Sequence, residues 1–481
     1  MNKIAAIVGG GVIGGGWAAR FALMGWDVRV FDPDPEAQRK IGEVVAGAER
    51  ALPMLYDAPM PARGTISFHT DLAEAVAGAA YIQESVPERL ELKHKVLAAI
   101  QAACSPESVI GSSTSGFKPS ELQQGAARPG QIVVAHPFNP VYLLPLVELV
   151  PGDDADEPIF EQACDILRAI GMYPLHVQAE IDAHIADRFL EAVWREALWL
   201  VNDGIATTEQ IDNAIRYGFG LRWAQMGLFE TYRVAGGEAG MRHFMEQFGP
   251  CLKWPWTKLM DVPEFTDELV DLIAGQSDAQ SGHMSIRQLE RLRDNNLVAM
   301  LRALKGQEAA AGKLILDHEA TMQQPLVDEV PLITVRRKVP VDWVDVNGHM
   351  NEGRYGQVFS DASEAVMTHV GADRAYIAAG HSYFTAETSI KYLAETLVGE
   401  DILVETRVTL GDGKKLRLWH EMKRAADGEM LASCDQFLLH VSLATRRSCP
   451  PLADVRDAVE RLARLHAGAS EGPAPRAPRD I

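Results

Sequence analysis

A glycine-rich turn near the N-terminus constrains the fold of this chain more than any other feature. Residues 3–8 form a short apolar run typical of a buried strand, and residues 17–24 suit a helix. Between them lies the run Gly9-Gly10-Gly11-Val12-Ile13-Gly14, which has the spacing G-x-G-x-x-G. A strand, this spacing and a helix together predict a βαβ unit that binds a dinucleotide where the helix begins.

Individual positions of this segment have separate roles. Gly9 permits the tight turn, Gly11 lets a pyrophosphate approach the backbone, and Gly14 allows the helix to pack closely on the strand. Asp32 follows a second strand-like run at 27–31. Its carboxylate would accept hydrogen bonds from the ribose hydroxyls and repel a 2′-phosphate, so NAD is expected rather than NADP. The predicted cofactor-binding set here is Gly9, Gly11, Val12, Ile13, Gly14 and Asp32.

Changes in the hydrophobic pattern divide the 481 residues into several domains, more than one core can hold. Strand-like runs at 80–85, 109–112 and 132–136 alternate with helices such as 90–103, long helices follow at 184–201 and 286–304, and period-two alternation appears late in the chain. The expected fold class is multidomain: an α/β Rossmann domain (1–180), an all-α helical domain (181–320), a linker (321–331), an α+β domain (332–450), a C-terminal helix (451–467) and a disordered tail (468–481).

Charge and cysteine content exclude several functions. The net charge of −20 disfavours a nucleic acid or an anionic membrane as partner. The five cysteines lie far apart without a C-x-x-C pair, so neither a disulfide framework nor a bound metal is expected. No unbroken apolar run of about 18 residues is present, as a membrane span would need. We expect a protein of the reducing cytoplasm.

His136 and Glu148 form the first candidate for catalysis. His136 ends a strand-like run, and Glu148 follows 12 residues later. A hydride leaves a secondary alcohol only as a base removes the hydroxyl proton, and histidine titrates in the required range. A carboxylate on the other ring nitrogen would fix the tautomer. Without further context, a structural histidine and a solvated glutamate are the alternative interpretation.

Three segments with matching motifs make residues 1 to about 320 resemble the 3-hydroxyacyl-CoA dehydrogenase family. The segments are His136-x-x-Asn139-Pro140 with Glu148, Ser112-Ser113-Thr114-Ser115, and Pro87-Glu88-Arg89 with Lys93. The resemblance implies that His136 and Glu148 are the catalytic pair and that Ser115 and Asn139 hydrogen-bond the reacting oxygen. It also implies that Glu88 and Lys93 lie in the cofactor site, near the nicotinamide ribose.

One departure from the family concerns the substrate. Where the family has a Val-Asn-Arg run, this chain has Ile185-Ala186-Asp187-Arg188. The Asp187-Arg188 pair and the Ser-Ser-Thr-Ser-Gly-Phe run at 112–117 resemble family members that oxidise small free hydroxy acids. This resemblance implies L-carnitine as substrate, with L-gulonate or a 3-hydroxyacyl-CoA as alternatives. Arg188 and Arg222 are candidates for the substrate carboxylate. Candidates for a cation–π wall around a quaternary ammonium are Trp223, Phe229, Tyr232, Trp254 and Trp256.

A second motif lies in the C-terminal part, in the run Trp343-Val344-Asp345-Val346-Asn347-Gly348-His349-Met350-Asn351. With the following helix and alternating strands, residues 330–450 resemble the hot-dog thioesterases of the 4-hydroxybenzoyl-CoA type. The resemblance implies Asp345 as nucleophile or general base, supported by Asn347 and His349, and a short CoA thioester such as betainyl-CoA as substrate. The alternative is a non-catalytic dimerisation module. Both families form dimers, so a homodimer is expected.

Overall fold

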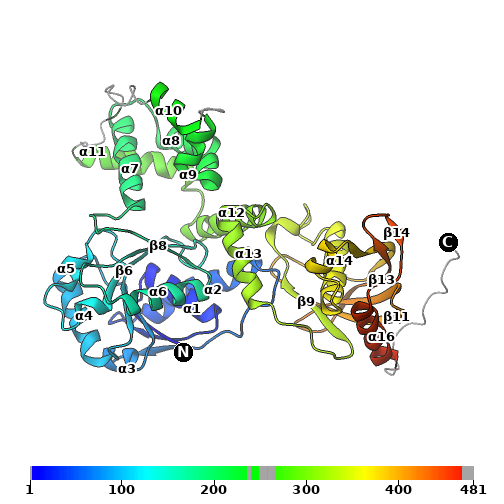
Figure 1. Ribbon diagram of the computed structural model, residues 1–481. Coiled ribbons are helices and arrows are strands. Elements are labelled where there is room, and N and C mark those ends of the chain that lie inside the picture. Colours follow the sequence, from blue (N-terminus) through cyan, green and yellow to red (C-terminus); the bar gives the residue numbers. More distant parts are fainter. Residues whose placement is uncertain (1–2, 236–239, 249–256, 258–263, 265, 468–481) are drawn as a thin grey trace. The chain divides into compact units, whose positions relative to one another are not determined.

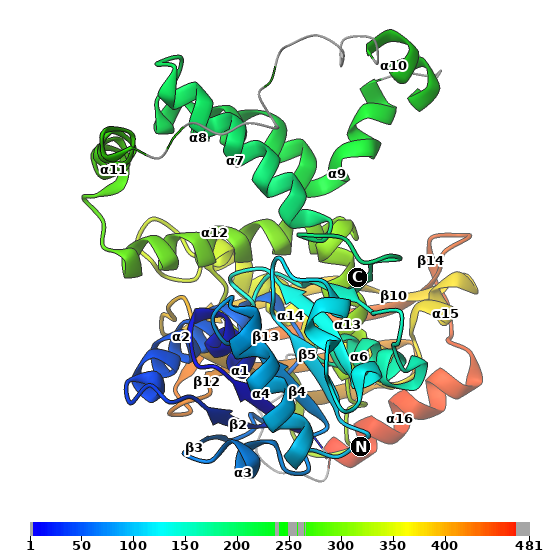
Figure 2. The same cartoon turned by 90° about the vertical axis from the view of Figure 1, so that its left-hand side faces the viewer.

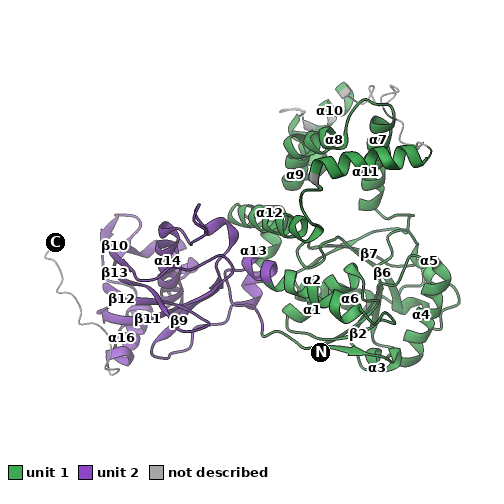
Figure 3. Cartoon of the chain, turned by 180° about the vertical axis from the view of Figure 1, so that it is seen from behind, with its two compact units in different colours: residues 1–49, 62–318 green, residues 50–61, 319–481 purple. Residues whose placement is uncertain are grey.

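The computed structural model describes residues 3–235, 240–248, 257, 264 and 266–467. Its internal contacts divide the chain into two compact units (Figure 3). The first unit contains residues 1–49 and 62–318, and the second contains residues 50–61 and 319–481.

An eight-stranded sheet organises the first unit. Its strand order is β3-β2-β1-β4-β5-β6-β7-β8, with the first six strands parallel and β7 antiparallel to β6. The order reverses between β1 and β4, and ligands of such sheets bind outside the carboxyl ends of the strands at this reversal. The strands are β1 (Ile4–Val8), β2 (Asp27–Phe31), β3 (Ile66–His69), β4 (Tyr81–Glu84), β5 (Val109–Ser112), β6 (Ile132–Pro137), β7 (Leu146–Val150) and β8 (Tyr173–His176).

Helices cover this sheet (Figure 1), and its central strands are buried on both faces. Val8, Ile82, Ile110 and Val134 of four neighbouring strands belong to one apolar cluster. Such strands are apolar at successive positions because both faces are covered. The helices are α1 (Val12–Leu23), α2 (Ala37–Ala51), α3 (Leu72–Val76), α4 (Leu90–Ala103), α5 (Pro119–Gln123) and α6 (Glu157–Ala169).

Helices dominate the rest of the first unit (Figure 2). The helix α12 is tied to the sheet domain, because the Tyr142 hydroxyl donates a 2.8 Å hydrogen bond to Asp294 and Arg287 pairs with Glu43. The elements are α7 (Ala186–Asn202), α8 (Thr208–Ala214), the π-helical turn η3 (Ile215–Phe219), α9 (Gly220–Ala235), α10 (Gly240–Phe248), α11 (Asp267–Ser281), α12 (Ile286–Gly306) and α13 (Ala310–Met322), which ends in the second unit.

In the second unit, an antiparallel sheet packs against one long helix, α14 (Glu352–His369). The sheet order is β10-β13-β12-β11-β9. Val358, Phe359 and Ala362 of α14 are fully buried in one cluster with Val404 and Met422 of the sheet. The other elements are β9 (Leu332–Lys338), α15 (Arg374–Ala378), β10 (His381–Tyr392), β11 (Asp401–Gly411), β12 (Lys415–Arg424), β13 (Met430–Ser442), β14 (Arg447–Ser448) and α16 (Ala453–Ala467).

The predicted fold class is confirmed: the chain has a Rossmann-type sheet, a helical region and a separate antiparallel sheet packed on a helix. The domain boundaries remain predictions. The structure differs from them in one feature: residues 50–61 belong to the second compact unit. The predicted disordered tail at 468–481 lies outside the described residues. None of the helices in the described ranges has both the length and the hydropathy required to span a lipid bilayer.

Candidate active sites

The glycine turn has the geometry that a bound dinucleotide requires. Gly9 has a φ of 108°, and a side chain there would collide with the carbonyl group of Ser85 after β4. A Cβ at Gly14 would overlap the carbonyl oxygen of Gly9, so the helix and the turn pack against each other. A Cβ at Gly11 would contact no protein atom, which leaves room for a ligand. Gly11 is also the N-cap of α1, where backbone N–H groups attract phosphate.

Asp32 lies directly after β2 and faces this turn. Its carboxylate accepts hydrogen bonds from the backbone N–H of Gly10 and, at 2.7 Å, from that of Asp34. The turn and the carboxylate are therefore held together, in the arrangement that recognises a ribose diol. Val12 and Ile13 begin α1 beside them. Together these residues fit a dinucleotide.

Glu88 and Lys93 belong to a partly buried charge cluster at the end of β4. The Lys93 ammonium pairs with Glu84 at 3.0 Å and with Glu88 at 3.2 Å, and its side chain is 1% exposed. Burial would raise the pKa of Glu88, but hydrogen bonds from Thr114 and the Lys93 charge outweigh it and lower the pKa. The Glu88 side chain remains 41% exposed. Glu88 is thus accessible to a cofactor, whereas the buried Lys93 is placed to orient Glu88.

His136 and Glu148 meet because β6 and β7 pair antiparallel. The two residues are direct partners in the register of these strands. Nδ1 of His136 lies 3.0 Å from Oε2 of Glu148, whose side chain is fully buried. Nδ1 therefore carries the hydrogen, since only a donor can satisfy the carboxylate. Nε2 is left with a lone pair that can accept a proton.

The second carboxylate oxygen of Glu148 holds the start of the helical region. It accepts 2.8 Å hydrogen bonds from the backbone N–H groups of Ile185 and Ala186, at the start of α7. Burial would raise the pKa of Glu148, but the His136 contact and these two hydrogen bonds outweigh it and lower the pKa. Glu148 is therefore ionised at neutral pH and fixes both the imidazole and the helix.

Two further side chains beside His136 were not predicted as site residues. The Asp187 carboxylate lies 3.7 Å from Nε2 of His136, on the side opposite Glu148. The ring centroid of His184 lies 5.7 Å from that of His136, and Nδ1 of His184 is buried without a hydrogen-bond partner. Ala183 and His184 both have positive φ, at 59° and 48°. Strained backbone of this kind clusters at functional sites.

The remaining predicted residues of the first site differ in position. Ser115 and Asn139 are exposed and follow the strands β5 and β6, at the carboxyl edge to which His136 also belongs. Arg188 and Arg222 are exposed. Trp223 packs on Phe219 with centroids 4.6 Å apart, Tyr232 stacks on Phe244, and Phe229 is 70% exposed. Trp254 and Trp256 lie outside the described residues.

The predicted thioesterase motif forms a tight turn just before α14. Gly348 has a φ of 80°, and its N–H donates to the carbonyl of Asp345 at 3.0 Å. The Asp345 carboxylate accepts a 2.8 Å hydrogen bond from the N–H of Asn347, whose side chain is exposed. Asn351 caps α14 by accepting from the N–H of Gly353. The turn thus lies directly before α14, and the Asp345 N–H donates a 2.9 Å hydrogen bond to the carbonyl of His349 within it.

A glutamate that sequence reasoning missed joins this turn. Nδ1 of His349 lies 3.3 Å from Oε2 of Glu395, which belongs to the connection between β10 and β11. His349 also bridges Leu397 of the same connection through its backbone. The sequence gives no signal for Glu395, because the contact depends on how two distant loops meet.

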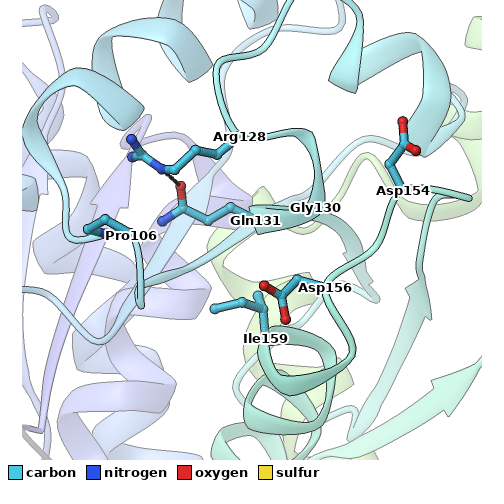
Figure 4. Close-up of a pocket in the computed structure, with 7 residues that line it drawn as sticks. All are labelled: Pro106, Arg128, Gly130, Gln131, Asp154, Asp156 and Ile159. Atoms are coloured by element: carbon cyan, nitrogen blue, oxygen red, sulfur yellow. Dashed lines mark hydrogen bonds between the residues drawn. The ribbon is translucent and has the colours of Figure 1, made fainter.

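A pocket in the first unit (Figure 4) lies at the edge of the sheet where β6 begins, opposite to the carboxyl edge that contains His136. Arg128 donates a 2.8 Å hydrogen bond to Gln131, immediately before β6 begins. His136 lies near the other end of the same strand. The pocket is lined by Pro106, Arg128, Gly130, Gln131, Asp154, Asp156 and Ile159. In the described part of the chain, no group of three or more His, Cys, Asp or Glu side chains is arranged to hold a metal ion.

Family models match both units. Residues 4–181 match the 3-hydroxyacyl-CoA dehydrogenase NAD binding domain, residues 184–264 match the C-terminal domain of the same family, and residues 339–459 match the thioesterase-like superfamily. The predicted NAD cofactor and both predicted resemblances are thereby confirmed. A solved structure of an NAD-dependent 5-formyl-3-hydroxy-2-methylpyridine 4-carboxylic acid 5-dehydrogenase is 26% identical, with a TM-score of 0.54 over 64% of this chain and 99% of its own.

Relatives of full length have both modules. A Ruegeria pomeroyi protein named L-carnitine dehydrogenase/betainyl-CoA thioesterase is 64% identical over 97% of both chains. An Agrobacterium fabrum protein of the same name is 58% identical over 93% of this chain and 92% of its own. A Pseudomonas putida L-carnitine dehydrogenase is 52% identical over 64% of this chain and 96% of its own. The chain therefore belongs to the family of two-module L-carnitine dehydrogenase/betainyl-CoA thioesterases.

Proposed function

We propose that the chain oxidises the 3-hydroxyl of L-carnitine to 3-dehydrocarnitine with NAD, and that its second unit hydrolyses betainyl-CoA. The observation that carries the first activity is the His136–Glu148 pair at the carboxyl edge of a dinucleotide-binding sheet. The likeness over 97% of the chain to a protein with this double name supports the substrates. The test is NADH formation with L-carnitine and CoA release from betainyl-CoA by the full chain.

In the first reaction, Nε2 of His136 takes the proton of the substrate hydroxyl. At the same time, a hydride leaves the carbon that bears this hydroxyl. NAD supplies the hydride acceptor when bound. Glu148 keeps Nδ1 protonated and stabilises the imidazolium that forms, through the 3.0 Å contact. Ser115 and Asn139 hydrogen-bond the reacting oxygen as it becomes a carbonyl. Glu88 binds the cofactor near the nicotinamide, and Lys93 holds Glu88 in place.

In the second reaction, Asp345 attacks the thioester carbonyl or activates a water molecule that does so. The carbonyl oxygen lies near the N-terminus of α14, where backbone N–H groups and the helix dipole stabilise the developing negative charge. The thiolate of CoA leaves, and water completes the carboxylic acid product. His349 and Asn347 are the supporting polar groups, and Glu395 orients His349 through the 3.3 Å contact.

Asp32 makes the cofactor preference testable. We expect a strong preference for NAD over NADP in kcat/KM for L-carnitine oxidation. Asp32→Ser removes charge-assisted hydrogen bonds worth about 1.5–3 kcal/mol, so kcat/KM for NAD should fall about 10- to 100-fold. The value for NADP should not fall, because the repulsion of the 2′-phosphate is lost as well. Similar kcat/KM values for NAD and NADP in the parent protein would contradict the role of Asp32.

A homodimer is the proposed assembly. In the single chain, α7 has a row of exposed apolar side chains: Phe189, Leu190, Val193 and Trp194 are 52%, 56%, 37% and 54% exposed. A helix with such a row needs a partner surface. Light scattering at micromolar concentration should give twice the chain mass of 52.6 kDa. A particle of single-chain mass would contradict the proposal. We propose the cytoplasm as its compartment, because NAD and CoA thioesters are available there.

A further inference from the structure

The charges around His136 do not balance. Glu148 lies at Nδ1 and Asp187 at Nε2, so two carboxylates face one imidazole. Burial lowers the pKa of the neighbouring His184, and the charge of His136 lowers it further, so His184 adds no positive charge at neutral pH. Once His136 has accepted the hydroxyl proton, one negative charge still remains. Keeping a partly buried carboxylate ionised is costly unless a cation or hydrogen bonds compensate its charge.

Among the described residues, Asp187 has no cation of its own beside it, because His136 already pairs with Glu148. Within the part of the chain that the structure describes, His136 is the one basic side chain with a nitrogen within 4.0 Å of the Asp187 carboxylate. The side chain is 20% exposed, and burial raises its pKa although His136 opposes the shift. Its place in the first turn of α7 favours the ionised form, because the helix dipole stabilises an anion there.

We propose that Asp187 binds the quaternary ammonium group of the substrate and thereby selects a cationic hydroxy acid. This inference rests on the proposed oxidation of L-carnitine. The hydroxyl oxygen must lie within about 3 Å of Nε2 for proton transfer. The ammonium nitrogen is two bonds from the carbinol carbon, about 2.5 Å away. The cation therefore lies in the space around Nε2, where Asp187 is 3.7 Å from that nitrogen.

Asp187 also orients the substrate. The substrate carboxylate is the same number of bonds from the carbinol carbon as the ammonium nitrogen, so distance alone does not distinguish the two ends. The negative charge of Asp187 attracts the ammonium end and repels the carboxylate end. Asparagine, the amide usual in the family at this position, would suit a neutral thioester. The Asp187 carboxylate is thus a specificity-determining group rather than a second base.

The test compares two isosteric substrates with an isosteric variant. The substrates are L-carnitine and 3-hydroxy-5,5-dimethylhexanoate of the same spatial configuration, in which an uncharged tert-butyl group replaces the trimethylammonium group. We expect Asp187→Asn to lower kcat/KM for L-carnitine about 100-fold, as for a lost partly buried charge pair, and to change that for the neutral substrate less than about 5-fold. Asp182→Asn is the control and should change neither value, because the Asp182 side chain is 77% exposed and lies in the connection before α7.

Calorimetry separates binding from the role of His136. The probes are 4-(trimethylammonio)butanoate and 5,5-dimethylhexanoate, which have no hydroxyl group to oxidise. Asp187→Asn should weaken binding of the first and leave that of the second unchanged, with NAD affinity and melting temperature as folding checks. The proposal would be overturned if Asp187→Asn lowered kcat/KM equally for L-carnitine and for its neutral isostere, or lowered it for neither. A parent protein that leaves L-carnitine unoxidised would overturn the proposed function instead, and the calorimetric comparison would still decide the role of Asp187.

Discussion

His136→Ala is expected to lower kcat for L-carnitine oxidation by about 10²–10⁴-fold, the usual contribution of a positioned general base. The reason is geometric: Nδ1 is held by Glu148 at 3.0 Å, so Nε2 is the atom left to accept the hydroxyl proton. NAD affinity should change little, because the proposed cofactor contacts are made by the glycine turn and Asp32, elsewhere on the sheet edge. Initial rates of NADH formation measure the first effect, and fluorescence titration with NADH measures the second.

Two comparison variants make this result specific. His283→Ala, an exposed histidine between α11 and α12, should retain parental kcat. Glu148→Gln should lower kcat less than His136→Ala does, because it weakens the orientation of the base without removing the proton acceptor. A kcat within about threefold of the parent for His136→Ala, well below the range for a general base, would show that another group removes the proton.

Asp345→Asn is expected to lower kcat for betainyl-CoA hydrolysis by about 10²–10⁴-fold, whether Asp345 is the nucleophile or the base. Asparagine keeps the size of the side chain and can still accept the 2.8 Å hydrogen bond from Asn347, so the turn should survive. Release of CoA, followed with a thiol reagent, is the measurement. Asp457→Asn in α16 is the control, since its side chain is 67% exposed, and it should retain parental CoA release.

The same variant decides between catalysis and a purely structural module. Asp345→Asn should leave carnitine oxidation unchanged, because Asp345 belongs to the second unit and His136 and Glu148 belong to the first. If Asp345→Asn releases CoA as fast as the parent, Asp345 has no catalytic role. If the parent itself releases no CoA from betainyl-CoA or other short acyl-CoA thioesters, the second unit is a dimerisation module.

Local patterns predicted much of the fold. The helix expected at 90–103 and the strand expected at 109–112 have the bounds observed for α4 and β5. The strand β7 was not predicted, although it contains Glu148, because a buried glutamate interrupts its short apolar run. Its pairing with β6 explains why a separation of 12 residues brings His136 and Glu148 face to face. The family motif suggested that His136 and Glu148 act as a pair. The contact between them could be seen only from the register of β6 and β7.

Contacts between distant segments were beyond the reach of sequence patterns. Asp187 was noticed only as a departure from a family motif, and its position 3.7 Å from His136 depends on how α7 begins. Glu395 meets His349 through a loop 46 residues away. Residues 50–61 group with the second unit, where the N–H of Ala58 donates a 2.7 Å hydrogen bond to Glu319. Side-chain type and spacing do not predict such long-range contacts, because the contacts arise from tertiary packing.

If one chain contains two independent active sites, a crossed assay separates them. The full-length parent, His136→Ala and Asp345→Asn are each assayed for NADH formation from L-carnitine and for CoA release from betainyl-CoA. We expect the parent to have both activities, His136→Ala to lose only NADH formation, and Asp345→Asn to lose only CoA release. Two independent active sites would be contradicted if the parent lacked one or both activities. They would also be contradicted if a single variant abolished both activities while remaining folded.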